Sequence, residues 1–147
     1  MAEKNAKRNG IGMILTLILL YATYTKQNPE TGFIYVGRTS GWVKMVEFIT
    51  AQKIVKRRDQ NHHKSKDGYD DAVLDKYSID PNAIRGREQE GIEKNRAKGI
   101  SGNKRNGISP RNKKRLIYMS AALAAFTETT GWYYIFPYLM VLANSHL

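Results

Sequence analysis

The chain has no cysteine and has few acidic residues for the number of its basic ones. The absence of cysteine excludes disulfides, thiolate zinc sites and a cysteine nucleophile. The 147 residues hold 24 Lys and Arg against 13 Asp and Glu, which gives a formal charge of +11. A charge of that size favours a polyanionic partner, with nucleic acid as the first candidate and an anionic membrane surface as the second.

Long apolar runs are missing as well. The first run, Ile11 to Leu20, follows three basic residues but is too short for a membrane span, which needs about 20 apolar residues. We expect a first core strand there rather than a cleaved signal peptide or an uncleaved anchor, because cleavage near Ala22 would remove most of that strand. The last run, from Gly131 to Ala143, is interrupted by Pro137 and is consistent with core, a partner surface or a membrane contact.

The basic residues are concentrated in one stretch. Residues 97–115 hold seven Lys and Arg and no acid, and no Lys or Arg follows Arg115. The length fits one domain over residues 1–147, with a core over about 14–127 and an apolar tail over 128–147. A β-β-α-β-α-loop-α order predicts an α+β fold in which a small, mainly antiparallel three-stranded sheet is flanked by helices.

The pattern predicts particular elements within that order. Two strands flank the turn at Asn28 to Gly32, and a helix runs from about Trp42 to Asn61 after Ser40-Gly41. A short strand follows at residues 72–74. Pro81 begins a second helix that ends near Ala97, and Ser109-Pro110 begins a third that runs to about Phe126.

Two tyrosines, Tyr24 and Tyr35, stand eleven residues apart on either side of the predicted turn. A hairpin would bring both phenols onto neighbouring strands, although a hairpin with two tyrosines is also a common structural feature. Arg58 and His62 are four residues apart and would share one face of the first helix.

Glu88 is the sharpest chemical signal in the second helix. It lies four residues after Ile84 and four before Ile92, so its carboxylate points to the packed face. A carboxylate there needs a partner. The structural candidates are the nearby Arg85 and Arg87, and the functional candidate is a divalent cation.

These residues, in this order, resemble the GIY-YIG endonuclease family over residues 20 to 108. The Tyr-Val-Gly step at residues 35–37 is similar to the second half of the family signature, whereas Ala22-Thr23 replaces its first Gly-Ile. In the family the arginine follows the second tyrosine more closely, while Arg58 comes 23 residues after Tyr35, so Arg57 remains a competitor. Stretches around Val36, Lys56 and Arg85 are also similar to toxin-type GIY-YIG domains of bacterial secreted polymorphic toxins.

The resemblance implies a metal-dependent nuclease that uses Mg²⁺ or Mn²⁺ and acts on nucleic acid, DNA before RNA. Tyr24 would be the general base, Arg58 would bind the scissile phosphate, and Glu88 would be the metal ligand. It further implies action in the cytoplasm, delivery as a secreted effector, and an immunity or other protein partner. The catalytic residues so implied are Tyr24, Tyr35, Arg58, His62, Glu88, and Asn103 or Asn106, and the nucleic-acid-binding residues are Arg38, Arg57, Lys104, Arg105, Lys113 and Lys114.

Two other interpretations are weaker. The glycine spacing from Gly102 to Ser109 is similar to a phosphate loop, but Ile108 stands where the loop needs lysine. His62-His63 lacks a second ligand cluster, and we expect His63 to be an exposed residue at a helix end.

The main rival function is a non-enzymatic module that binds nucleic acid through residues 98–115 and docks on a membrane or partner through its apolar ends.

Overall fold

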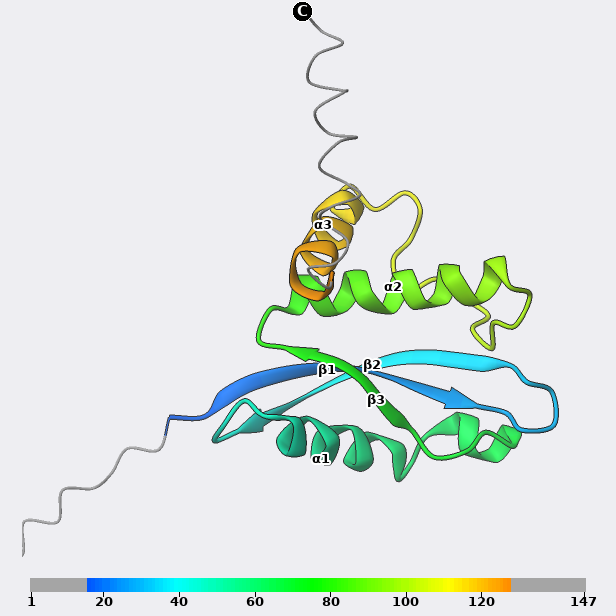
Figure 1. Cartoon of the computed structure of the whole chain (residues 1–147), viewed down its shortest axis with the longest axis horizontal. Coiled ribbons are helices and arrows are strands. Elements are labelled where there is room, and N and C mark those ends of the chain that lie inside the picture. The colour runs from blue at the N-terminus through cyan, green and yellow to red at the C-terminus, as the bar shows by residue number, and fades with distance from the viewer. Residues whose placement is uncertain (1–15, 128–147) are drawn as a thin grey trace, which may run out of the picture.

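A computed structural model of the chain describes residues 16–127. Its elements are β1 (Ile18–Gln27), β2 (Ile34–Val43), α1 (Phe48–Asp59), the 3₁₀ turn η1 (His63–Asp67), β3 (Val73–Ser78), α2 (Pro81–Ala97) and α3 (Arg115–Phe126). α1 covers one face of the sheet, α2 covers the other, and α3 lies on the far side of α2 (Figure 1). The predicted α+β class with a three-stranded antiparallel sheet is confirmed.

The sheet order is β2-β1-β3, so β1 is the central strand and β2 is an edge strand. The turn between β1 and β2 is closed by the Asn28 side chain, whose Oδ1 accepts hydrogen bonds from the backbone N–H groups of Glu30 and Thr31, both at 3.0 Å. Gly32 completes the turn at a φ of 73°. The resulting register places Gly37 opposite Tyr24 and Lys26 opposite Tyr35.

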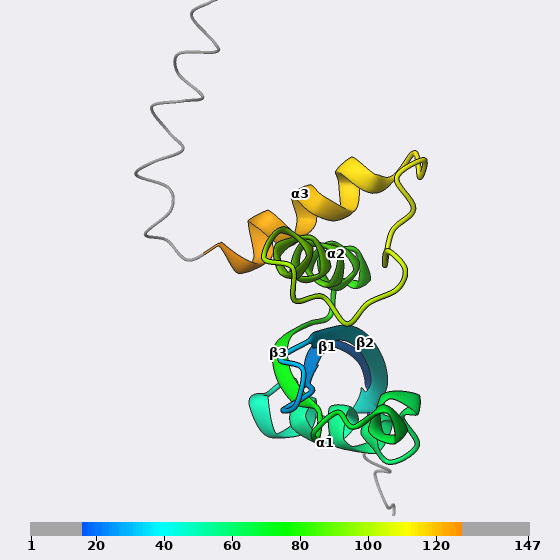
Figure 2. The ribbon, with the colours of Figure 1, turned by 90° about the vertical axis from the view of Figure 1, so that its right-hand side faces the viewer.

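Each face of the sheet has its own core. Leu20, Ala22 and Tyr24 alternate along β1 and pack with Ile54 and Val55 of α1. On the other face, Gly91 of α2 lies over Val36, and a Cβ on it would come within 3.2 Å of that side chain. The view in Figure 2 shows the same succession of α1, sheet, α2 and α3.

α2 and α3 cross at a glycine. A Cβ on Gly86 would stand 2.0 Å from the Tyr118 carbonyl oxygen, so only glycine allows this approach. Tyr118 and Ala122 are the buried residues of α3. The crossing fixes α3 on the outer side of α2, away from the sheet.

Two helix boundaries differ from the prediction. The expected start of the first helix at Trp42 is wrong, because β2 continues to Val43 in register with β1, and α1 begins at Phe48 and ends at Asp59. The third helix starts at Arg115, not at Pro110, since residues 109–112 form a turn in which Asn112 N–H bonds the Ser109 carbonyl at 3.0 Å.

The remaining elements follow the prediction closely. α2 has the expected bounds, with Asp80 as its N-cap, whereas the third strand, expected over residues 72–74, runs over residues 73–78. The predictions for the apolar run before Thr16 and for the tail after Thr127 lie outside the described residues. Within the described part, no helix is both long and apolar enough to cross a membrane.

Candidate active site

The two tyrosines meet across the β1–β2 ladder. Their ring centroids are 6.5 Å apart, Tyr24 is buried, and Tyr35 is half-buried. Gly37, directly opposite Tyr24, makes this possible, because a Cβ there would lie 2.6 Å from the Tyr24 ring and 2.9 Å from the Tyr35 ring. The Tyr-Val-Gly step of the sequence therefore has a steric reason in the structure.

His62 binds the Tyr24 phenol, and its own backbone neighbour fixes its tautomer. Its Nδ1 accepts a hydrogen bond from the Lys64 backbone N–H at 3.1 Å, so Nδ1 carries no proton. In the neutral ring the proton then sits on Nε2, which lies 2.9 Å from the Tyr24 hydroxyl oxygen. His62 consequently donates to that oxygen, which is the geometry that would stabilise a phenolate.

Burial controls the protonation of both groups. The pKa of His62 falls from 6.5 to about 4, because the ring is buried and lies near His63 and the Lys26 ammonium. The pKa of Tyr24 rises from 10.0 to about 12 through burial and the nearby Tyr35, and the Arg58 guanidinium opposes this rise. The protein's own groups thus keep His62 neutral and Tyr24 protonated at pH 7.

Arg58, and not Arg57, faces the tyrosines. Its charge acts on the pKa values of Tyr24, Tyr35 and His62, and its side chain is exposed. Arg57 lies elsewhere, beside Gly41 at the far end of β2. The long spacing from Tyr35 to Arg58 is explained by the continuation of β2 and the late start of α1.

The predicted shared helix face for Arg58 and His62 is wrong. α1 ends at Asp59, and His62 lies beyond it as the N-cap of η1. Both residues still lie near Tyr24, because the chain turns between the end of α1 and the start of η1. That turn includes a hydrogen bond of 3.0 Å from the His62 N–H to the Asp59 carbonyl.

Glu88 approaches from α2 with a nearly buried carboxylate. Its Oε2 lies 3.0 Å from Arg38 Nη1, and the side chain is only 12% exposed. Burial raises its pKa, while Arg38 and Arg85 oppose that rise. Neither expected partner from its own helix forms an ion pair with Glu88. Arg87 binds Asp75 through two hydrogen bonds of 2.9 Å, and Arg85 lies over the Tyr118 ring and acts on Glu88 only through its charge.

Arg38 therefore belongs to the site and does not stand alone as a surface cation. Despite the ion pair, Glu88 Oε2 has no hydrogen-bond partner of good geometry among the described residues. Gly107 leaves it room, because a Cβ there would lie 2.5 Å from this oxygen.

The loop after α2 closes the site, and its two asparagines have different roles. Asn103 clamps β2 by accepting from the Val36 N–H and donating to the Val36 carbonyl, both at 2.8 Å. Asn106 accepts from Arg96 of α2. Both asparagines thus brace the loop, and neither side chain bonds a tyrosine or Glu88.

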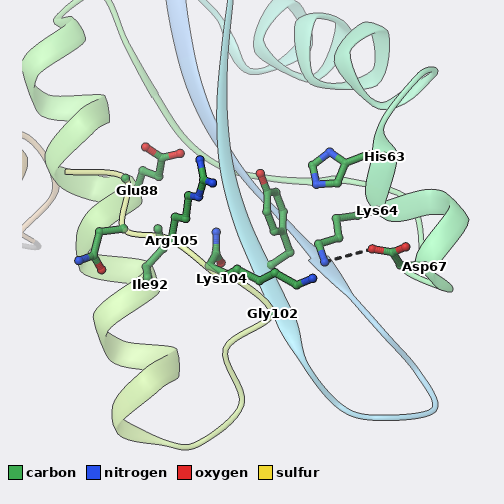
Figure 3. Close-up of a pocket in the computed structure, with 12 residues that line it drawn as sticks. His63, Lys64, Asp67, Glu88, Ile92, Gly102, Lys104 and Arg105 are labelled. Atoms are coloured by element: carbon green, nitrogen blue, oxygen red, sulfur yellow. Dashed lines mark hydrogen bonds and ion pairs between the residues drawn. The ribbon is translucent and has the colours of Figure 1, made fainter. Parts of the chain in front are cut away.

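A cavity of about 330 Å³ lies between this loop, β2 and η1. In Figure 3, Glu88 and Arg105 stand on one side of it, His63 and Lys64 on the other, and Lys104 reaches across. Of the predicted nucleic-acid contacts, only Lys104 and Arg105 line this cavity. Lys113 and Lys114 are exposed at the start of α3, and Arg57 lines a separate cavity.

Sequence reasoning missed several residues here. His63 is exposed but not at a helix end: it begins η1, stacks on His62 at 4.6 Å and lines the cavity. Lys64 is nearly buried, pairs with Asp67 at 3.2 Å and lies over the rings of Tyr35 and Tyr69. No spacing in the sequence marks Lys64, although its place directly after His62-His63 is a signal in hindsight.

A buried ion pair supports the tyrosine side. Lys26 Nζ contacts the Asp59 carboxylate and lies 3.0 Å from the Ser65 hydroxyl. The second Asp59 oxygen accepts from the Ala72 N–H at 2.8 Å. Burial opposes ionisation of Asp59, but the hydrogen bonds from Lys26 and Ala72 keep its pKa below its usual range. The pair joins β1, the end of α1, η1 and the entry to β3.

The residues present fit a single-carboxylate cation site and not a larger cluster. Over residues 16–127, no three Asp, Glu or His side chains gather as a ligand group. Glu88 lines the cavity, and its Oε2 is ion-paired with Arg38 but has no hydrogen bond of good geometry among the described residues. A lone carboxylate of this kind suits Mg²⁺, an ion that is commonly held by one or two carboxylates with water at its other positions. Comparisons of the chain with protein-family models, with curated proteins and with solved structures found no match.

Proposed function

We propose that this protein is a metal-dependent endonuclease of the GIY-YIG type that hydrolyses phosphodiester bonds of DNA or RNA. One observation carries the proposal. The Tyr24 hydroxyl lies 2.9 Å from His62, the Tyr24 and Tyr35 rings are 6.5 Å apart, and Tyr35 lines the same cavity as Glu88. Arg58 and Glu88, 30 positions apart and on opposite faces of the sheet, both act on the pKa values of the two tyrosines. The side chains that the motif order selects thus converge on one place in the fold.

The tyrosine side supplies the groups for proton transfer and phosphate binding. Tyr24, as phenolate, accepts the proton of the attacking water, and the Nε2–H of His62 stabilises its oxygen. The exposed Arg58 guanidinium binds two oxygens of the scissile phosphate, for which its planar fork is suited. Tyr35, between Tyr24 and the cavity, orients the water or the phosphate.

The opposite side supplies the carboxylate. Glu88 would hold one Mg²⁺ or Mn²⁺, which when bound stabilises negative charge on the phosphate and leaving oxygens and favours the phenolate. Arg38, 3.0 Å from the Glu88 carboxylate, opposes the rise in the Glu88 pKa that burial causes. Lys64, Lys104 and Arg105 line the cavity as further cations for the nucleic-acid backbone.

The nucleic-acid substrate is supported by the charge of +11 and by the cations around the cavity. A role as an antibacterial effector, acting in the cytoplasm of a target cell and countered by an immunity protein, rests on the similarity to toxin-type domains alone. It is part of the proposal as its biological setting.

A plasmid-nicking assay tests the proposal. The full chain is incubated with supercoiled plasmid, and in parallel with a structured RNA, in Mg²⁺, in Mn²⁺ and with chelator. We expect conversion to nicked or cleaved product with either metal and none with chelator. Tight binding of both nucleic acids without cleavage under any metal condition would instead identify the non-enzymatic binding module.

A further inference from the structure

The exposed edge strand β2 carries a line of side chains away from the candidate active site. Arg38, Ser40 and Trp42 alternate with the buried Gly37, Gly41 and Val43, so the first three stand on one face of the strand. Arg38 is the partner of Glu88, and Trp42 is 65% exposed. An indole so open to water in a regular strand makes little contribution to the core.

Trp42 borders a second cavity, of about 310 Å³. Its other lining residues come from the end of β2 and from α1, and its charged members are all cations: Lys44, Lys53 and Arg57. No carboxylate lines it. An exposed aromatic plane beside a group of cations is the combination that binds a nucleic-acid strand, because bases stack on the ring while phosphates pair with the cations.

We propose that Trp42 and this cavity form a binding subsite for the nucleic-acid strand that flanks the scissile phosphate. A base stacks on the Trp42 indole, and the adjacent phosphates contact Lys44, Lys53 and Arg57. The inference rests on the proposed endonuclease function and extends it, since it assigns a second contact region for the same substrate. Arg57, which faces away from the tyrosines, has its role here.

The position of the subsite favours nucleic acid over other occupants. Trp42 is four residues after Arg38, which is about 13 Å along β2. That length matches roughly four nucleotide steps of a duplex strand at 3.4 Å each. A strand lying along β2 would therefore reach both Glu88 and Trp42. The consecutive α1 residues Arg57 and Arg58 divide between the two regions in the same way.

Exposed apolar side chains next to the subsite make an anionic membrane surface the main competing ligand. Met45, Val46, Phe48 and Ile49 are each more than 40% exposed. With the neighbouring lysines they would also suit an anionic membrane surface. The test below separates the two.

The direct test uses Trp42 as its own probe. Trp132, the only other tryptophan of the chain, is replaced by Trp132→Phe in the full-length protein, so that fluorescence reports on Trp42. The protein is titrated in chelator with a single-stranded oligonucleotide of mixed sequence, and separately with vesicles of phosphatidylserine and phosphatidylcholine. We expect quenching by the oligonucleotide and no blue shift with the vesicles. A blue shift with vesicles and no quenching by the oligonucleotide would overturn the subsite.

Affinity gives the second measurement. Replacing an aromatic side chain that stacks on a base by alanine lowers the affinity for nucleic acid by about 5- to 150-fold. We expect Trp42→Ala to raise the Kd for the oligonucleotide within that range and Trp42→Phe to restore most of it. Phe33→Ala is the matched control, because Phe33 is also exposed but lies at the opposite end of β2. Equal effects of Trp42→Ala and Phe33→Ala would contradict the proposal.

Cleavage separates this inference from the function on which it rests. At substrate concentrations below the Kd, Trp42→Ala should cleave more slowly than the parent, by about the factor by which its Kd rises, because the rate then follows the fraction of protein that is bound. Cleavage by the parent protein without Trp42 quenching would leave the endonuclease standing and reject the subsite. Quenching without cleavage by the parent would reject the endonuclease and keep Trp42 as a nucleic-acid contact.

Discussion

The two sides of the candidate active site are built in different ways. On the tyrosine side, Tyr24, His62 and the Lys26–Asp59 pair are buried and hydrogen-bonded to one another or to backbone. On the α2 side, Glu88 is held by an ion pair with Arg38 but by no hydrogen bond of good geometry among the described residues, and Lys104 and Arg105 are exposed. The first side fixes geometry, and the second offers charge to a ligand.

This difference teaches where substitutions should act. A change on the tyrosine side disturbs a packed network, so stability and chemistry respond together unless the change is isosteric. A change on the α2 side removes charge from a cavity wall, so catalysis responds to loss of the carboxylate and binding to loss of the cations, while the fold is kept.

The largest effect is expected from Glu88→Gln. The substitution keeps the shape of the side chain but removes the charge that would hold the cation, so we expect cleavage to be abolished with nucleic-acid binding nearly intact. Plasmid nicking and a binding titration measure the two. Glu90→Gln is the matched control, because Glu90 is exposed on the same helix and pairs with Arg87. Equal cleavage by Glu88→Gln and the parent would refute the metal-ligand role.

Tyr24→Phe tests the tyrosine side without disturbing its volume. Loss of a positioned proton acceptor should slow the chemical step by about 10²- to 10⁴-fold. If the Tyr24 hydroxyl were only structural, its loss would lower the free energy of unfolding by about 0.5–1.5 kcal/mol and leave cleavage nearly unchanged. Tyr35→Phe should have a comparable effect, and Tyr21→Phe, on the opposite face of β1, should not. An active Tyr24→Phe with an inactive Tyr21→Phe would mean that the motif alignment is wrong.

The pH profile of cleavage sharpens the same comparison. Because the Tyr24 pKa is about 12 in the protein alone, the phenolate fraction rises about tenfold per pH unit below that value. The single-turnover rate should therefore rise with pH through neutrality. It should level off where the pH reaches the Tyr24 pKa as the bound cation lowers it. His62, with a pKa of about 4, should add no inflection near 6.5. An inflection near 6.5 that disappears in His62→Gln would assign the base to His62 instead.

Loss of the buried Lys26–Asp59 pair should chiefly lower the free energy of unfolding. Asp59→Asn leaves Lys26 charged and unpaired in the interior, which typically costs about 3–5 kcal/mol. Urea denaturation measures this loss. Glu93→Gln is the control, because it removes the carboxylate from an exposed pair with Arg115, where a loss of about 0–1 kcal/mol is expected. Similar losses for both variants would show that the pair does not anchor the tyrosine side.

The smallest effect concerns the basic stretch, which the structure divides in two. Neutralising Lys104 and Arg105 at the cavity should reduce the log–log salt slope of duplex binding by about 1.8, at about 0.9 per lost phosphate contact. Neutralising Lys113 and Lys114, at the start of α3, should change it less. Binding measured between 50 and 200 mM salt gives the slopes. A larger change from the α3 pair would move the binding surface away from the cavity.

The sequence predicted those features that local pattern determines. The hairpin followed from two β-rich runs around Asn28 to Gly32, and α2 from Pro81 and its apolar spacing. The inward direction of Glu88 followed from Ile84 and Ile92. The sequence could not predict Arg38 as the partner of Glu88, because that pairing depends on how closely β2 and α2 approach each other.

The failures share a cause. Trp42 and Val43 entered the helix prediction because the sequence around Gly41 looks like a break, whereas pairing with β1 extends the strand. Ser109-Pro110 has the residues of a helix start, but the chain makes a turn there before Lys114. A tertiary contact accompanies both departures: pairing with β1 extends β2, and a hydrogen bond of 2.9 Å from the Ile108 N–H to Gln89 Oε1 of α2 holds the chain just before the turn. Lys64 and Lys26 were missed because only the fold brings them beside the tyrosines.

Asn103 also determines how far the edge of the sheet is open to another strand. The backbone groups of Ile34 bond to Ile100 and Gly102, and the Asn103 amide then takes the place of one more backbone residue at Val36. An unpaired strand edge invites a second chain to add on and aggregate. The loop therefore shields the half of β2 nearest the tyrosines from such pairing. Replacing Asn103 by leucine would uncover Val36, and self-association of the protein would become the consequence to watch in solution.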